Sequence, residues 1–127
     1  MAEVTKGQRL SWSRAITEED IARFAELSGD KGVHHVEKDE QGRLMAHGLL
    51  TATLPTKLGG EVDYMASTMQ FEFLKAVYAG DTLSCEGIVE AVINQKSRQK
   101  VRFSFTVKNQ HGDVVLRGET KGQILRR

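Results

Sequence analysis

A strict alternation of apolar and polar residues near the C-terminal end constrains the fold of this chain most. The apolar set is Val101, Phe103, Phe105 and Val107, and the polar set is Arg98, Lys100, Arg102, Ser104, Thr106 and Lys108. Successive side chains of a β-strand point to opposite faces of the sheet. The pattern therefore predicts a strand with one buried and one solvated face, which is typical of antiparallel sheets.

Other segments indicate further strands. An extended stretch is predicted from Gln8 to Ala15, and a last strand from Val114 to Leu125 after a turn at His111-Gly112-Asp113. Two more segments have apolar residues that share one parity: Met65, Met69, Phe71 and Phe73 in the first, and Leu83, Cys85, Val89 and Ala91 in the second. A run of long antiparallel strands is therefore expected after Asp63.

A first helix is predicted just after the N-terminal strand. Thr17 and Asp20 resemble a capping box at its start, and Gly29 is typical of a helix end. Apolar residues recur between them at helical spacing, so that one helix face can pack inward. The polar residues 30–43, which include two glycines, are predicted to form a loop.

A second helix is predicted to begin near His47. Its apolar positions recur every four residues, at Ala46, Leu50, Leu54 and Leu58. Pro55 should kink this helix or end it early, because proline lacks the N–H that a helix interior needs. Gly59-Gly60 is expected to end it in any case.

Helices followed by long strands predict an α+β fold in one domain spanning residues 1–127, with one helix packed on the inner face of the sheet. No segment approaches the roughly 20 apolar residues of a membrane-spanning helix. The start of the chain lacks an apolar signal region, and the single Cys85 fits a reducing compartment, so a cytoplasmic location is expected. A net charge of +1 argues against general nucleic-acid binding.

Asp30 and His35 are the first candidates for catalysis. They lie five residues apart just after the first helix, where a loop can turn both side chains inward. An imidazole can give or take a proton near neutral pH, and a carboxylate beside it can hold a water molecule. In the alternative reading, Asp30 only caps a turn and His35 is exposed. His34 leaves open which of the two adjacent imidazoles points inward.

His47-Gly48 is the second candidate, at the start of the second helix. Glycine at this position lets a ligand carbonyl approach a backbone N–H closely. Alternatively, Gly48 only permits close packing of helix and sheet. A metal site at His34, His35, His47 and Asp30 is disfavoured because no histidine pair has i, i+4 spacing, and no metal or cofactor is expected.

Basic residues on the polar face of the 98–108 strand form a further candidate site. Such a stripe is commonly a solvated surface, but Arg98 and Lys100 could also contact phosphates of a cofactor-like substrate.

Three segments together resemble the MaoC-like, (R)-specific enoyl-CoA hydratases of the hotdog fold. They are Phe24 to Asp30 followed by His35, then Ala46-His47-Gly48-Leu49-Leu50, and finally Gly80-Asp81-Thr82-Leu83. The resemblance extends from about Thr17 to the C-terminus. It implies a long central helix wrapped by a curved antiparallel sheet, and a homodimer or larger homo-oligomer with its active site near the subunit interface.

The resemblance also implies roles for individual residues. Asp30 and His35 would activate the water that adds to C3 of a trans-2-enoyl thioester, and the Gly48 N–H would bind the thioester carbonyl. His34, His47, Leu49, Arg98 and Lys100 are expected to contact substrate. The chain departs from the family where Asn-Pro is replaced by Gly32-Val33, and where His34 replaces an apolar residue. Gly32 is expected to make the catalytic loop more flexible.

The leading functional prediction is a hydratase or dehydratase that acts on acyl-CoA or on an acyl carrier protein thioester. A hotdog thioesterase is the alternative enzyme, although such enzymes usually carry an acidic residue on the central helix, and residues 48–57 contain none. A catalytically silent acyl-CoA binding module is the third possibility, because of the altered residues 32 and 33. Neither nucleic acid nor a membrane is expected as a partner.

Overall fold

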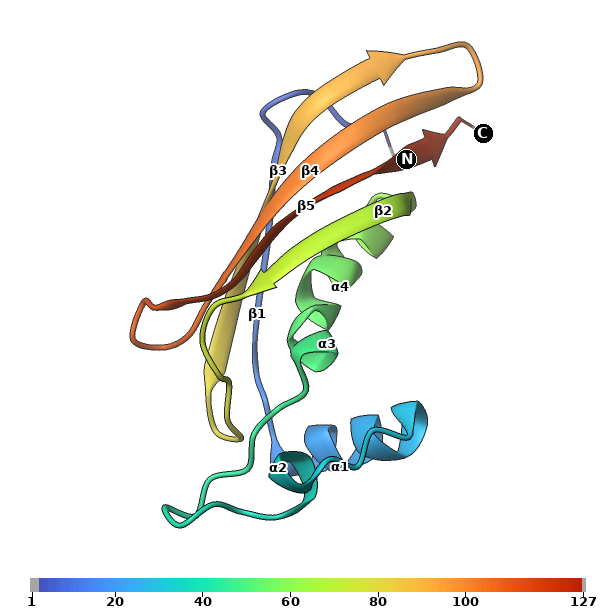
Figure 1. The fold of residues 1–127 in the computed structure, drawn as a ribbon. Coiled ribbons are helices and arrows are strands. Elements are labelled where there is room, and N and C mark those ends of the chain that lie inside the picture. Colours follow the sequence, from blue (N-terminus) through green and yellow to red (C-terminus); the bar gives the residue numbers. More distant parts are fainter. Residues whose placement is uncertain (1–2, 127) are drawn as a thin grey trace.

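The structure is a computed structural model that describes residues 3–126. Five strands form one antiparallel sheet in the order β1-β3-β4-β5-β2 (Figure 1). Within the described residues, no helix is long and apolar enough to cross a membrane. In chain order the elements are β1 (Arg9–Ala15), α1 (Glu18–Ser28), α2 (Val33–Val36), α3 (Gly48–Thr51), α4 (Thr53–Glu61), β2 (Tyr64–Phe73), β3 (Thr82–Asn94), β4 (Arg98–Lys108) and β5 (Val114–Leu125).

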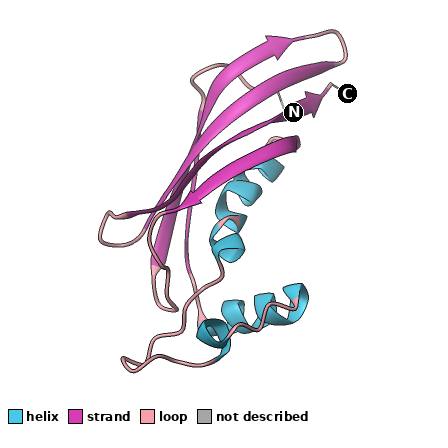
Figure 2. Cartoon of the chain, viewed as in Figure 1, coloured by secondary structure: helices cyan, strands magenta, loops and turns pink. Residues whose placement is uncertain are grey.

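The central strand β4 confirms the predicted alternation. Its apolar residues face the core, and Phe103 and Val107 are fully buried. The sheet is curved, and α3 and α4 lie along its core-facing side (Figure 2). Leu54 and Leu58 of α4 have no exposed surface. An α+β fold with a helix on the inner face of an antiparallel sheet is therefore confirmed.

The N-terminal helix α1 begins and ends where the sequence predicts. The Thr17 hydroxyl accepts a hydrogen bond from the Asp20 N–H, and the Asp20 carboxylate accepts one from the Thr17 N–H. Gly29 ends the helix with a φ of 78°, a conformation that favours glycine. These caps place α1 beside α2, beyond the start of α3 (Figure 1).

The predicted long central helix is not present. Two short helices, α3 with four residues and α4 with nine, meet at Ala52. Pro55 explains the break, because it cannot donate to the Thr51 carbonyl and its ring would crowd that oxygen. Restarting the helix at Thr53 places Pro55 in the first turn of α4, where proline is tolerated.

Other local predictions were wrong in detail. Gly59-Gly60 does not end the helix, which continues to Glu61. Residues 30–43 are not entirely a loop, because α2 forms one helical turn at residues 33–36. In β2, a register shift between Ala66 and Thr68 interrupts the alternation. Three of the four apolar residues assigned to one parity are consequently exposed by about half: Met65, Met69 and Phe73.

The close approach of β2 and β5 depends on Gly122. A Cβ atom at this position would lie 2.1 Å from the Met65 carbonyl oxygen and 2.7 Å from the Ala66 Cα. We expect Gly122→Ala to lower the free energy of unfolding by about 2 kcal/mol or more, because the backbone of β2 must move. Urea denaturation would measure the change.

Gly60→Ala is the matched control, because a Cβ there meets no atom within 4 Å. Alanine in a helix is favoured over glycine, so this variant should gain about 0.5–1 kcal/mol. Equal stability of the two variants would contradict the close-approach argument.

Candidate active site

A short turn between α1 and α2 positions Asp30. The Asp30 N–H donates to the Ser28 hydroxyl at 3.0 Å, and the Asp30 Oδ1 accepts from the Gly32 N–H at 3.1 Å. These local bonds leave Oδ2 free, and the side chain is 58% exposed. Asp30 therefore presents an accessible carboxylate oxygen on a hydrogen-bonded turn.

The helical turn α2 turns His35 inward. Its side chain is 7% exposed, and its Nδ1–H donates to the Met45 carbonyl at 2.8 Å. Because a carbonyl oxygen can only accept, the proton of the neutral ring lies on Nδ1 and the lone pair on Nε2. This Nε2 lies 3.8 Å from Asp30 Oδ2. The gap exceeds a direct hydrogen bond, and an oxygen atom between the two groups can contact both.

His47 lies behind this pair and is 2% exposed. Its Nε2–H donates to the backbone carbonyl of Asp30 at 2.9 Å. Its ring stacks on His35, with centroids 3.7 Å apart and an interplanar angle of 17°, and also contacts Phe24 at 4.8 Å. His47 Nδ1 is buried without a hydrogen-bond partner in the described structure.

The N–H groups at the start of α3 supply donors. Within residues 3–126, neither the Gly48 nor the Leu49 N–H donates to a protein acceptor. Both residues are exposed, Leu49 by 63%. A Cβ at Gly48 would lie 2.8 Å from the Phe73 ring. Gly48 therefore permits close packing, which was the alternative interpretation of this glycine. It also carries an unpaired N–H donor, which binding of a ligand carbonyl requires.

A cavity of about 290 Å³ adjoins Gly48. Its lining includes Gly48, Met45 and Phe73, but neither Asp30 nor His35. Met45 connects the two regions, because its carbonyl holds the His35 ring. Phe24 lies in a segment that carries the family resemblance, but the sequence predicted no role for it or for Met45, since a ring contact and a backbone carbonyl leave no recognisable residue pattern.

The electrostatic environment keeps Asp30 ionised. The hydrogen bond from the Gly32 N–H is the largest cause that lowers the pKa of Asp30; slight desolvation opposes it, and attraction to His35, His47 and His34 adds to it. A carboxylate with a lowered pKa is charged at neutral pH. Asp30 can therefore accept hydrogen bonds from water or substrate.

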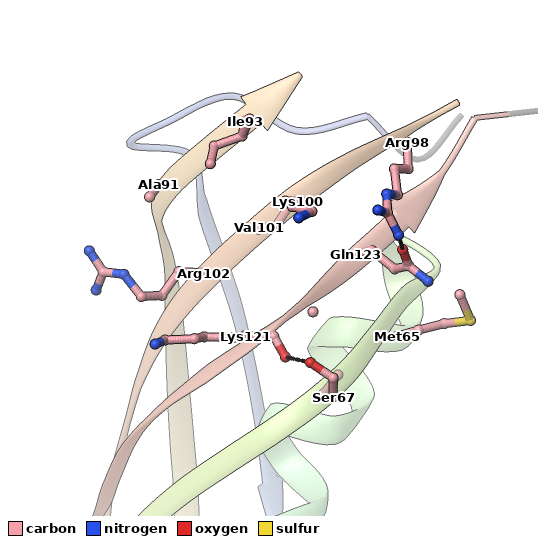
Figure 3. Close-up of a pocket in the computed structure, with 12 residues that line it drawn as sticks. Met65, Ser67, Ala91, Ile93, Arg98, Lys100, Val101, Arg102, Lys121 and Gln123 are labelled. Atoms are coloured by element: carbon pink, nitrogen blue, oxygen red, sulfur yellow. Dashed lines mark hydrogen bonds between the residues drawn. The ribbon is translucent and has the colours of Figure 1, made fainter. Parts of the chain in front are cut away.

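Three other predicted site residues are His34, which lies next to His35, and Arg98 and Lys100, which lie at the far end of the sheet. His34 is exposed, and its ring contacts His35 at a centroid distance of 3.9 Å. Arg98 and Lys100 line a groove of about 680 Å³ on the sheet face that points away from α4 (Figure 3). Within one chain, this groove lies at the end of the sheet opposite to α1 and α2 (Figure 1).

The Asp30–His35 pair and the adjacent His47 each have an atom that could ligate a metal. Such atoms of Asp30, His35 and His47 lie within 4.8 Å of one another. The Nε2 of His47 bonds to the Asp30 carbonyl oxygen and the Nδ1 of His35 bonds to the Met45 carbonyl, which leaves His35 Nε2 and His47 Nδ1 without a hydrogen bond in the described structure. Each of the two imidazoles is thus held in one orientation by a backbone carbonyl.

Comparisons with known proteins identify the family to which the chain belongs. Residues 5–117 match the family model described as the FAS1-like dehydratase domain region. The chain belongs to this family. It is 31% identical, over 92% of its length and 85% of the relative, to an (R)-specific enoyl-CoA hydratase of Rhodospirillum rubrum. The resemblance to MaoC-like (R)-specific hydratases is therefore confirmed.

Solved structures confirm the hotdog fold. The unliganded R-hydratase PhaJ1 of Pseudomonas aeruginosa is 26% identical with a TM-score of 0.84, and the match covers 99% of this chain and 88% of that one. An (R)-hydratase of A. caviae, 22% identical, superposes with a TM-score of 0.85 over 98% of this chain and 99% of that one.

The pKa of Asp30 provides a test of the turn. Gly32 has a φ of −52°, which proline can adopt, so Gly32→Pro should remove the N–H donor while the exposed His34 ring moves away from the new Cβ, which would otherwise lie 3.1 Å from it. We expect the pKa of Asp30 to lie below its usual value in the natural chain and to rise in this variant. Carbon-detected NMR titration of the carboxyl groups would measure both.

Asp39 is the internal control for this titration. Its pKa is also lowered, chiefly by the Arg43 N–H, and should not change in Gly32→Pro. An unchanged pKa of Asp30 in the variant would show that the Gly32 bond is not the cause.

Proposed function

We propose that this protein catalyses the reversible addition of water to a trans-2-enoyl-CoA, giving an (R)-3-hydroxyacyl-CoA. One observation carries the proposal: His35 Nε2 and Asp30 Oδ2 are 3.8 Å apart and both are anchored by hydrogen bonds. A water molecule held between a carboxylate and an unprotonated imidazole nitrogen is a suitable nucleophile. Membership of the dehydratase family supports the same reaction.

In the proposed reaction, His35 Nε2 accepts one proton from the bound water. The Asp30 carboxylate accepts a hydrogen bond from the other O–H of the same water. The water oxygen forms a bond to C3, and the π electrons of the C2–C3 bond move toward the thioester carbonyl. His35, which holds the proton taken from the water, then returns a proton to C2. In the dehydration direction, the same groups remove the C2 proton and protonate the leaving hydroxyl.

The Gly48 N–H is proposed to bind the thioester oxygen as negative charge develops there. The support is an exposed N–H without a protein acceptor, directly beside the segment that holds His35. A donor that strengthens its bond in the transition state contributes about 10²–10³ in rate in comparable sites. Leu49 is proposed to contact the acyl group of the substrate. His34 is proposed to contact the substrate at the edge of the same site.

The thioesterase alternative is not favoured. Glu61 is the one acidic residue between Gly48 and the end of α4, and it pairs with Lys57 at 2.9 Å. No carboxylate of α3 or α4 is therefore available near Gly48 to activate water for hydrolysis.

We expect Asp30→Asn and His35→Ala each to lower the rate of crotonyl-CoA hydration at least 100-fold, since the first removes the charged carboxylate that holds the water and the second removes the base. Loss of the enoyl-thioester absorbance would measure the rate, with a thiol reagent in parallel. His111→Ala is the matched control, because His111 lies in the turn between β4 and β5.

Thiol release without loss of the enoyl band would instead identify a thioesterase. Saturable binding of acyl-CoA without either signal would identify a silent binding module. Either result would overturn the proposed hydratase.

We further propose that the protein is a homodimer formed through β2. This strand is an edge of the sheet, and its exposed Met65, Met69 and Phe73 are unusual on an edge that remains in water. A two-fold axis would place the start of one β2 beside the end of the other. Phe73, which covers Gly48, would then approach the groove of the partner subunit.

The basic groove is proposed to recognise the phosphates of CoA bound in the opposite subunit. Arg102 and Lys121 are directly opposed in register, which costs stability between like charges. Within residues 3–126, Arg102 is the one groove cation with a carboxylate partner, Glu119 at 3.2 Å, whereas Arg98 bonds to the amides of Gln95 and Gln123. Such an excess of positive charge suits a polyphosphate.

We expect Arg98→Ala/Lys100→Ala to raise KM for crotonyl-CoA about tenfold but to leave KM for a truncated crotonyl thioester without nucleotide unchanged. Mixing this variant with Asp30→Asn should restore kcat/KM, because one hybrid site then combines an intact Asp30 with an intact groove. Steady-state kinetics of the refolded mixture would measure the recovery.

Absence of recovery would exclude a groove that acts across subunits. An acyl carrier protein remains the alternative carrier. An equal rise in KM for its thioester in the Arg98→Ala/Lys100→Ala variant would indicate a surface that binds either carrier.

We also propose that the chain is one domain with a cytoplasmic location, which is consistent with a single, buried thiol at Cys85.

A further inference from the structure

We propose that His47 is a positioning residue that fixes both members of the Asp30–His35 pair at once. This inference rests on the proposed hydratase function. A side chain that is 2% exposed has little surface to offer a substrate, although the sequence suggested a substrate contact. Its contacts with Asp30 and His35 instead suggest that it acts through these two residues.

The first contact restrains the turn that carries Asp30. All other hydrogen bonds of Asp30 are local, to Ser28 and Gly32, and the turn is flanked by glycines at 29 and 32. The bond from His47 Nε2–H to the Asp30 carbonyl links residues 17 positions apart in the sequence. It is therefore the bond that ties this turn to the segment before α3.

The second contact restrains the His35 ring. The two imidazoles are nearly parallel at 3.7 Å, so His47 limits rotation of His35 about its side-chain bonds. The Met45 carbonyl fixes the same ring in its plane. Together the two restraints aim His35 Nε2 toward Asp30.

The backbone of His47 also begins α3. Its carbonyl accepts hydrogen bonds from the Leu50 and Thr51 N–H groups, which directs the Gly48 N–H outward. One residue thus joins the base, the carboxylate and the proposed oxyanion donor. A displacement of about 1 Å among such groups can cost 10² in rate.

Stability alone does not explain a histidine at this position. Its Nδ1 is buried without a partner, which is unfavourable, and phenylalanine could fill a similar space beside Phe24 without that cost. What phenylalanine cannot supply is the donor to Asp30. This difference separates a positioning role from a packing role.

Three substitutions test the proposal. His47→Gln keeps a side-chain N–H near the place of Nε2, His47→Asn has a shorter amide, and His47→Phe keeps only the ring. We expect kcat for crotonyl-CoA hydration to fall about 30- to 100-fold in His47→Phe and His47→Asn, with KM changed less than about threefold. His47→Gln loses the stacking on His35, but the Met45 carbonyl still holds that ring, so this variant should remain within about fivefold of the natural chain.

Amide hydrogen exchange provides a readout independent of activity. Exchange at Gly32 and His35, whose N–H groups bond to Asp30 Oδ1 and the Gly32 carbonyl, should accelerate in His47→Phe and His47→Asn but not in His47→Gln. Val89→Ala, a core substitution in β3, is the control for general destabilisation and should leave kcat unchanged.

Equal kcat in His47→Gln and His47→Phe, or a loss confined to KM, would overturn the positioning role. If His47→Phe does not fold, His47→Asn provides the same comparison. A natural chain without hydratase activity that still shows the expected exchange pattern would refute the proposed function and leave the restraint on the turn supported. Unchanged exchange in His47→Asn would refute that restraint whatever the activity.

Discussion

Burial of the apolar stripe on α3 and α4 against the curved sheet is the interaction on which the site depends. Leu50, Leu54 and Leu58 occupy the core with Phe103 of β4. Leu50 holds α3 in the core, and Leu54 and Leu58 hold α4, which adjoins α3 at Ala52, so the first residues of α3 are also fixed in position. His47 and Gly48 are therefore held in place at the start of α3. The hydrogen bond from His47 Nε2–H to the Asp30 carbonyl joins the turn that carries Asp30 to these residues. The core thus positions the chemistry through α3, although Asp30 itself is exposed.

The break at Ala52 is compatible with this role because both helix segments keep their apolar sides on the sheet. The Thr53 hydroxyl donates to the Leu50 carbonyl, and the Thr56 hydroxyl donates to the Ala52 carbonyl. These side chains bind carbonyls around the place where Pro55 interrupts the backbone ladder, so the cost of the break is partly offset. The kink lets both helices pack along the curved sheet, so that the start of α3 stays in place.

Much of the fold could be predicted because its signals are local. The alternation of β4 and the capping box at Thr17 each depend on neighbouring residues, and both are confirmed. The exposure of Met65 and Met69 could not be predicted, since it depends on a register shift and on the edge position of β2. In the site, Asp30 and His35 could be found from spacing and resemblance. The 3.8 Å between them could not, because it is set by the Met45 carbonyl and the His47 ring, which follow from tertiary packing.

Two of the departures from the family pattern, at residues 32 and 34, lie against each other in the structure. A Cβ at Gly32 would lie 3.1 Å from His34 Cε1 and 3.3 Å from Asp30 Oδ1, so the His34 ring occupies part of the space that a side chain at 32 would need. Glycine was expected to loosen the turn. Its N–H nevertheless binds Asp30 Oδ1, and its carbonyl accepts the His35 N–H at 2.8 Å. Gly32 thus contributes through its backbone to both members of the pair.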